Sequence, residues 1–138
     1  MHKASAEDTR FRDDFESGGI APEKFTHREH VRLAYIYLCG GDLQDAYSKT
    51  KDAILMLLKR NGIDTSKYHE TLTFAWLKAV LHFMNQTSDE VGSAADFIKK
   101  NPQLLNTKIM LSHYSPETLF SDEARASFVD PDIEPIPG

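Results

Sequence analysis

The stretch "KFTHREHVRLAYIYL" (residues 24–38) carries the clearest helix signals in the chain and decides the expected fold class. Thr26 stands where a helix N-cap is expected, and Glu29 follows three residues later, which is the pattern of a capping box. Apolar residues then recur at helical spacing, and Gly40 follows as a stop signal. The stretch therefore predicts an amphipathic helix from residue 27 to about residue 38, with two histidines in its first turns.

The same kinds of helix start and stop signals recur along the chain. Sustained period-two alternation, the signal of strands, is absent from the sequence. Three prolines in "FVDPDIEPIPG" (128–138) exclude a helix at the end. We therefore predict one all-α domain over residues 1–138, a bundle of six or seven helices with residues 1–7 disordered and residues 128–138 as an extended arm. The other predicted helices are a short one capped by Asp8 and ended by Gly18-Gly19, then 43–60, 67–85, one opened by Ser88-Asp89-Glu90, one started by Asn101-Pro102, and short ones at 115–117 and 121–123.

Composition narrows the class of protein. The chain has 138 residues, 41% of them hydrophobic, and a formal net charge of −5, which argues against nucleic-acid binding. Its single cysteine, Cys39, has no partner for an internal disulfide. The longest apolar run, "AILMLL" (53–58), is far short of the roughly 20 residues of a membrane span. We expect a soluble cytoplasmic protein without a nucleic-acid or membrane partner, and its size is compatible with a homodimer.

The direction of each histidine follows from the turn of about 100° per residue in a helix. His27 and His30 fall on the same side of their helix as its apolar residues. In the helix predicted for residues 67–85, His69 falls on the inner side, whereas Thr71 and His82 point the opposite way. Three histidines are therefore expected to face inward.

These three histidines lie in the first turns of two helices that are joined by one intervening helix. The two helices can then begin at the same end of the bundle. We expect His27, His30 and His69 to converge on one site, flanked by Tyr68 and Glu70.

One interpretation of this cluster is a metal site. Two imidazoles three residues apart on one helix and a third from another helix resemble the ligand sets of catalytic zinc or non-haem iron. His27, His30 and His69 would hold the ion, Glu70 would be a fourth ligand or general base, and Tyr68 a second catalytic candidate. This interpretation predicts a metal-binding protein and leaves open whether it is a small metal-dependent enzyme.

A second interpretation is a non-enzymatic module that binds a small anionic molecule or a protein partner. Two helix N-termini at one end would present free N–H groups and partial positive charge. The histidines would then act as donors or proton-transfer groups rather than metal ligands. Further groups of such a site would be Arg28, Arg32, Lys67, Tyr68, Thr71, Thr73, Trp76, Tyr114 and Arg125.

A third interpretation is structural. Buried histidines often pair with backbone groups, tyrosine or glutamate, and such a network could lock two helices together without any chemistry.

Four blocks of the sequence together resemble a family of small bacterial proteins that has no assigned activity. The blocks are "FTHREHVRLA" (25–34), "KYHETLTFAW" (67–76), "HYSPETLFSDEAR" (113–125) and "DPDIEPIP" (130–137), and the likeness runs from about Phe11 to Pro137. The resemblance implies a bacterial cytosolic protein and supplies no substrate. The positions it groups together are His27, His30, Arg32, Tyr68, His69, Glu70, Thr71, Trp76, Tyr114, Ser115 and Arg125.

Overall fold

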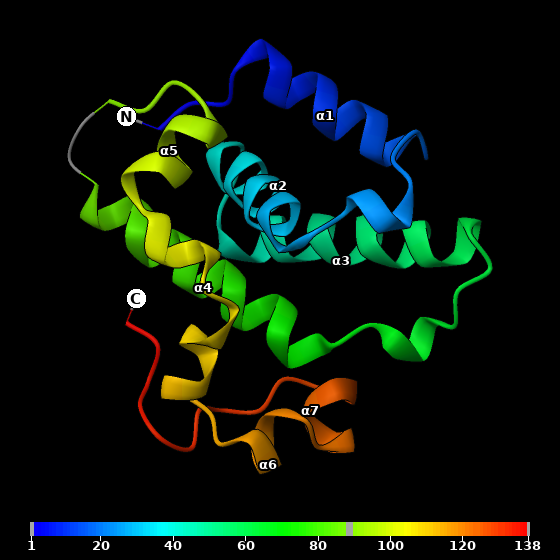
Figure 1. The fold of residues 1–138 in the computed structure, drawn as a ribbon, viewed down its shortest axis with the longest axis vertical. Coiled ribbons are helices and arrows are strands. Elements are labelled where there is room, and N and C mark those ends of the chain that lie inside the picture. The colour runs from blue at the N-terminus through cyan, green and yellow to red at the C-terminus, as the bar shows by residue number, and fades with distance from the viewer. Residues whose placement is uncertain (1, 88–89, 138) are drawn as a thin grey trace.

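The computed structural model describes residues 2–87 and 90–137, and within these ranges the chain is all-α apart from one isolated β-bridge between His2 and Val91 (Figure 1). The predicted fold class is thereby confirmed. None of the described helices is long and apolar enough to cross a membrane. The α-helices are α1 (Ala6–Glu16), α2 (His27–Cys39), α3 (Leu43–Arg60), α4 (Glu70–Gln86), α5 (Ala94–Lys100), α6 (Pro116–Leu119) and α7 (Asp122–Ala126), and the 3-10 helices are η1 (Pro22–Lys24), η2 (Thr65–Lys67), η3 (Pro102–Leu105) and η4 (Thr107–Ser112).

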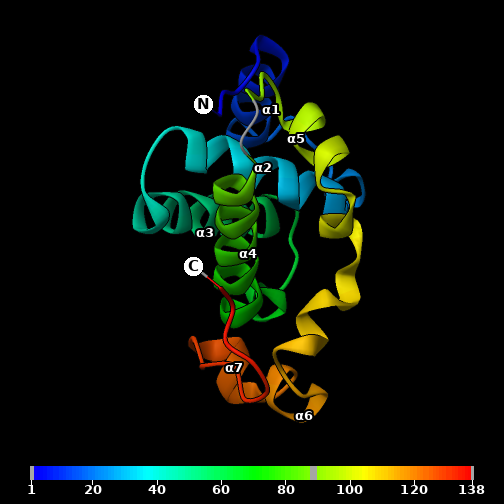
Figure 2. The same cartoon turned by 90° about the vertical axis from the view of Figure 1, so that its left-hand side faces the viewer.

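Helices α2, α3 and α4 pack pairwise against one another and form the centre of the molecule (Figures 1 and 2). α2 is buried along most of its length, and Leu33 and Tyr35 are completely inaccessible to solvent. α1 and α5 pack on α2, so that α2 is enclosed by neighbours on several sides. Burial of this apolar surface is the main force that holds the bundle together.

The N-terminal residues contact the rest of the bundle. Ser5, not Asp8, is the N-cap of α1, and Asp8 is its partner in a capping box. His2 lies against α4, with its Nε2 2.6 Å from the carbonyl oxygen of Met84, and the Lys3 amide donates to the carbonyl of Val91. Residues 2–5 therefore contact the bundle through hydrogen bonds, and the disorder expected for residues 1–7 stays a prediction.

A buried ion pair joins α1 to α2. The Asp8 carboxylate accepts hydrogen bonds from Arg32 Nε at 3.1 Å and from the Ala94 amide at 2.8 Å. Burial alone would raise the pKa of Asp8, but hydrogen bonds from the Ser5 and Ala94 amides and from Arg32 outweigh it and lower the pKa. Arg32 also stacks over the Phe11 ring. These contacts occupy Arg32 in holding α1.

Residues 107–137, here called the C-terminal segment, comprise η4, α6, α7 and the arm, and they cover the end of α4 that lies away from α1 (Figure 2). The arm contains no helix, as predicted, and its Ile136 is buried in a second apolar cluster with Ala75 and Ala79 of α4. Thr71, expected to point away from the core, is completely buried, because this segment lies over it. Its hydroxyl donates to the Ser127 carbonyl and accepts from the Val129 amide. The prediction for Thr71 was wrong because a distant segment covers that side of α4.

Several helix boundaries also differ from the predictions. α4 begins at Glu70 with His69 as its N-cap, whereas residues 65–67 form η2. Ser88 and Asp89 lie outside the described residues, and α5 begins only after the cap Ser93. Asn101-Pro102 starts a 3-10 helix instead of an α-helix. The predicted starts at Ser115 and Ser121 are confirmed.

Candidate functional site

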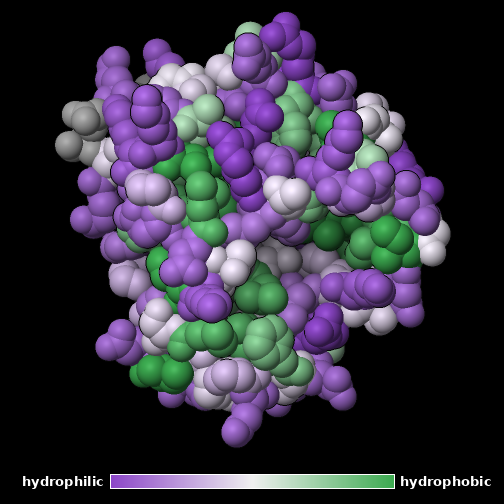
Figure 3. Space-filling model, viewed as in Figure 1, coloured by the Kyte–Doolittle hydropathy of each residue, from purple (hydrophilic) through white to green (hydrophobic). Residues whose placement is uncertain are grey.

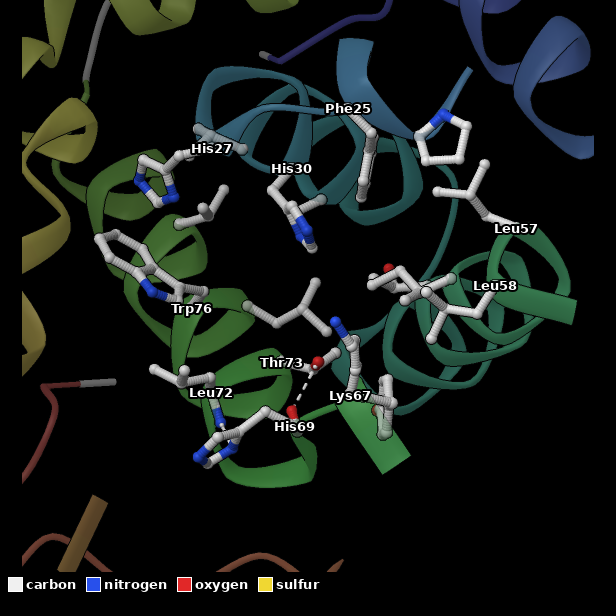
Figure 4. Close-up of a pocket in the computed structure, with 18 residues that line it drawn as sticks. Phe25, His27, His30, Leu57, Leu58, Lys67, His69, Leu72, Thr73 and Trp76 are labelled. Carbon is white, nitrogen blue, oxygen red and sulfur yellow. Dashed lines mark hydrogen bonds between the residues drawn. The ribbon is translucent and has the colours of Figure 1, made fainter. Parts of the chain in front are cut away.

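A pocket of about 370 Å³ lies between α2, α3 and α4, beside η1 and η2 (Figure 4). The surface on the face seen in Figure 3 is hollowed near its middle, where apolar and hydrophilic side chains meet. All three predicted histidines are among the lining residues, and most of the others are apolar. The lining residues are Pro22, Phe25, His27, His30, Val31, Ala34, Thr50, Ile54, Leu57, Leu58, Lys67, Tyr68, His69, Leu72, Thr73, Trp76, Leu77 and Val80.

His30 points into this pocket from α2 (Figure 4). Its ring packs against Phe25, with the ring centroids 4.1 Å apart. Burial, and to a smaller degree the charge of His27, lower the pKa of His30 to about 4. The imidazole is therefore neutral at neutral pH, with one nitrogen that can donate and one that can accept.

His27 is directed elsewhere. Its Nε2 lies 2.8 Å from the carbonyl oxygen of Leu104, so Nε2 must carry the hydrogen and donate it. Its ring meets Trp76 edge-on at 4.4 Å between centroids. His27 thus ties the start of α2 to η3.

His69 has both ring nitrogens occupied. Nδ1 accepts a hydrogen bond from the Leu72 amide at 3.1 Å, which caps α4, and Nε2 donates to the Leu119 carbonyl at 2.7 Å. Burial lowers the pKa of His69, in keeping with a neutral ring. Figure 4 shows the ring turned away from His30. His69 holds the C-terminal segment against α4.

The three histidines therefore line one pocket, as predicted, but their nitrogens do not converge. In the described part of the chain, no group of three His, Cys, Asp or Glu side chains is placed so that it could hold a metal ion. A metal bound to His69 would have to displace its cap or its bond to Leu119. The zinc or iron expected from the sequence stays a prediction, and the described residues do not form the ligand set proposed for it.

Glu70, predicted as a fourth ligand or base, lies outside the pocket. Its carboxylate accepts hydrogen bonds from the Tyr47 hydroxyl and from Lys51 Nζ, the latter at 3.0 Å. Both partners are on α3. Burial raises the pKa of Glu70. Glu70 thus links α3 to α4.

Tyr68 and Thr50 contribute buried hydroxyls to the pocket wall. Among the described residues, neither Thr50 Oγ1 nor Tyr68 OH has a hydrogen-bond partner, and both oxygens are enclosed by protein atoms. Burial raises the pKa of Tyr68, and the nearby Thr73 hydroxyl opposes that rise, although Thr73 itself donates to the His69 carbonyl at 2.9 Å. These two hydroxyls, the His30 ring and the Lys67 amine are polar groups of the pocket without a hydrogen-bond partner among the described residues.

Lys67 supplies a positive charge at the pocket. Its side chain reaches across the opening with the amine directed into it (Figure 4). Among the described residues no carboxylate lies within ion-pair distance of this amine, and Asp64, whose pKa Lys67 helps to lower, is its acidic neighbour. Of the predicted donors, His30, Lys67, Tyr68 and Thr73 line the pocket together with His27, whereas Arg28 and Thr71 lie outside it.

The remaining predicted ligand residues divide between the pocket and other places. Trp76 lines the pocket. Arg28 is on the surface beside Glu29, and Tyr114 is buried in the C-terminal segment with its hydroxyl donating to the Val129 carbonyl. Arg125, also in that segment, acts on His69 only through its charge.

The sequence analysis missed the wall that α3 provides, with Thr50, Ile54 and Leu57. The available signal was Thr50, a lone hydroxyl on the apolar face of that helix.

Comparison of the chain with protein-family models, with curated proteins and with solved structures gives no significant match. The resemblance carried by the four sequence blocks therefore stays a prediction.

Proposed function

We propose that this protein is a non-enzymatic module that binds a small, mostly apolar organic anion in the pocket between α2, α3 and α4. One observation carries the proposal: the amine of Lys67 is directed into an apolar pocket of about 370 Å³, and among the described residues no carboxylate lies within ion-pair distance of that amine.

The size and lining of the pocket support a small-molecule ligand. Ligand pockets usually measure about 300 to 1,000 Å³ and combine apolar walls with a few polar groups. The described lining of this pocket has that composition: it is mostly apolar, and His30, Lys67 and Thr73 are among its few polar side chains.

The charges support an anion. Lys67 is the cationic side chain that reaches into the pocket, and none of the lining residues is a carboxylate that would compete for it. The neutral ring of His30 does not repel the lysine amine. A carboxylate on the ligand would therefore find its counter-charge at Lys67.

Binding accounts for these residues better than catalysis. General acid–base chemistry requires a proton-transfer group held in place by a second polar residue. The His30 ring makes no hydrogen bond to a side chain or backbone group of the described residues, and the Glu70 carboxylate is bonded to α3 and is not among the groups lining the pocket. The described residues of the pocket include groups that can bind a ligand, but no proton-transfer side chain that a second polar residue holds in place.

Calorimetric titration with octanoate and with octanol tests this function. We expect octanoate to bind more tightly than the uncharged alcohol. Lys67→Met keeps the apolar stem, removes the charge and should weaken octanoate binding about tenfold while leaving octanol unaffected. Lys99→Met, which changes an exposed lysine of α5 outside the pocket, is the matched control. Equal binding of octanoate by the wild-type protein and the Lys67→Met variant would contradict the proposal.

A further inference from the structure

We infer that the organic anion of this pocket is an aromatic acid, whose ring packs against Phe25 and His30 while its carboxylate pairs with Lys67. This inference rests on the proposed function and specifies the chemical class of the ligand.

Two rings in contact form one wall of the pocket. Phe25, which follows η1, and His30, near the start of α2, have their ring centroids 4.1 Å apart and their planes inclined by 41°. Phe25 also packs against Phe15, at 4.6 Å between centroids, and Phe15 is a core residue that is only 3% exposed. The ring pair of Phe25 and His30 is therefore anchored in the core, and its orientation is fixed.

This ring pair keeps free surface toward the pocket. Both side chains are only partly buried, and both line the pocket. Figure 4 shows them directed into the cavity from one side, with the Lys67 amine directed into it from the other. In the core, by contrast, the rings of Tyr35 and Phe97 stack at 4.7 Å between centroids and are completely inaccessible to solvent. The protein itself covers the core rings, whereas the pocket rings are open to a ligand.

His30 favours an aromatic ligand over a saturated one. Its imidazole makes no hydrogen bond to the described residues, and because burial lowers its pKa to about 4, it is neutral at neutral pH and keeps one free N–H group. The edge of such a ring carries partial positive charge, and it packs well on the negative face of an aromatic ring, which can also accept a weak hydrogen bond from N–H. A saturated chain or ring has no negative face.

The size of the pocket suits one such ring. A water molecule occupies about 30 Å³ of liquid, so a pocket of about 370 Å³ has room for about twelve non-hydrogen atoms. A benzene ring joined to a carboxylate by a short chain has this size. The carboxylate then lies at Lys67, while the ring lies on the opposite side against Phe25 and His30. Trp76 of α4, which is also partly buried, adds a further aromatic side chain to the lining.

Phenylpropionate and cyclohexylpropionate, each with its ring at the end of the propionate chain, separate aromatic recognition from simple hydrophobic burial. The two acids have the same charge and the same carbon skeleton, and they differ only in whether the ring is aromatic or saturated. The saturated ring has at least as much apolar surface, so burial alone predicts that cyclohexylpropionate binds equally or more tightly. Aromatic packing predicts the reverse order.

Calorimetric titration of the full chain at neutral pH with these two acids is the first test. We expect phenylpropionate to bind about fivefold more tightly than cyclohexylpropionate. In His30→Leu, which keeps an apolar side chain but removes the ring, this advantage should fall to about twofold or less. His82→Leu is the matched control, because His82 lies outside the pocket on α4 and also has its ring against a phenylalanine, Phe83. The advantage should persist in that variant.

A second measurement on the wild-type protein needs no substitution. Intermolecular nuclear Overhauser effects should connect the ring protons of phenylpropionate with those of Phe25 and His30, and the methylene group beside its carboxylate with the side chain of Lys67. Contact of the ligand ring with neither protein ring would overturn the inference.

The binding results distinguish the inference from the proposed function. If cyclohexylpropionate binds as tightly as phenylpropionate, or if the aromatic advantage survives in His30→Leu, the ligand is not selected for its ring and the inference is overturned, while anion binding stands. Binding of octanoate without binding of either ring-containing acid has the same meaning. If none of the three acids binds, the proposed function fails together with the inference.

Discussion

Two regions beside the start of α4, its contact with the C-terminal segment and the wall of the pocket, differ in how their buried side-chain polar groups are paired. Toward the C-terminal segment, Thr71 and the cap His69 each make two hydrogen bonds, and Tyr114 donates to the arm. Toward the pocket, the hydroxyls of Thr50 and Tyr68 have no partner among the described residues. The first region resembles ordinary protein interior, where each polar group has its partner. The second region contains buried hydroxyls without such partners, and this difference distinguishes the pocket wall from ordinary protein interior.

Removal of His69 should give the largest effect on stability. His69→Ala removes the cap of α4 and leaves the Leu119 carbonyl without its donor, so we expect the free energy of unfolding to fall by about 3 kcal/mol. Urea denaturation at neutral pH measures this change. His30→Leu is the matched comparison in the pocket, and because the His30 ring makes no hydrogen bond to the described residues, we expect the free energy of unfolding at neutral pH to change little. Equal losses of unfolding free energy in His69→Ala and His30→Leu would show that the two regions do not differ in this way.

A variant that combines His69→Ala with His27→Ala addresses the metal that the sequence suggests. Elemental analysis of protein purified without an affinity tag should find well below one equivalent of zinc or iron, because the histidine nitrogens are directed to separate partners. Near-stoichiometric metal that is lost in a His27→Ala/His69→Ala variant would support the metal interpretation instead.

Acid should weaken the fold through the buried neutral histidines. The unfolded chain has a His30 pKa near 6.5 and the folded chain one of about 4, so between these pH values the unfolded state binds more protons. The contribution of His30 is therefore fully present above pH 6.5 and is lost as the pH falls toward 4, by up to about 3 kcal/mol. The lowered pKa of His69 acts in the same direction, whereas the raised pKa of Glu70 acts against it.

Urea denaturation across this pH range measures the loss. In His30→Leu the fall should be markedly smaller than in the wild-type protein. An unchanged pH dependence in that variant would show that His30 is not a buried neutral ring.

The paired and unpaired threonines offer a sharper comparison. Thr71→Val leaves the Ser127 carbonyl and the Val129 amide without their hydrogen-bond partner, and we expect the free energy of unfolding to fall by about 2 kcal/mol. Thr50→Val strands nothing, and we expect no loss or a small gain. Thermal and urea unfolding of the two variants provide the measurement. A clear loss of stability in Thr50→Val would mean that its hydroxyl has a partner within the protein.

The tyrosines should show the same contrast with the smallest effect. Tyr114→Phe removes one hydrogen bond to Val129 and should lower the free energy of unfolding by about 1 kcal/mol. Tyr68→Phe should leave it unchanged or raise it slightly. The two substitutions delete the same atom, so urea denaturation curves can be compared directly. If Tyr68→Phe were the more harmful change, the pocket hydroxyl would be a structural one.

Local signals predicted much of the fold. The helix of residues 43–60 has its cap at Asp42 and is followed by Gly62, whose φ of +65° suits glycine. Both ends of this helix can therefore be predicted from residues next to them. The start of α4 was placed too early because its cap is His69, a residue type that seldom serves as an N-cap. The inward direction of His27, His30 and His69 could be computed from helical geometry alone.

What the histidines contact could not be predicted in the same way. The partner of His27 is Leu104, 77 residues along the chain, and the partner of His69 is Leu119, 50 residues away. Both are backbone carbonyls, which carry no signal in the sequence. The burial of Thr71 likewise depends on residues 127–129. Helical periodicity therefore predicted which histidines line the pocket, whereas the hydrogen-bond partners of His27 and His69 depend on long-range packing.

The most direct test of the central claim is an NMR titration of isotopically labelled protein with octanoate. We predict that the signals of the His30 ring, the Thr73 methyl group and the Trp76 indole shift progressively and saturate, while the signals of Tyr114 and Ile136 stay in place. Shifts confined to the C-terminal segment, or no saturable shift of any of the three pocket residues, would contradict the proposal that this pocket binds an organic acid.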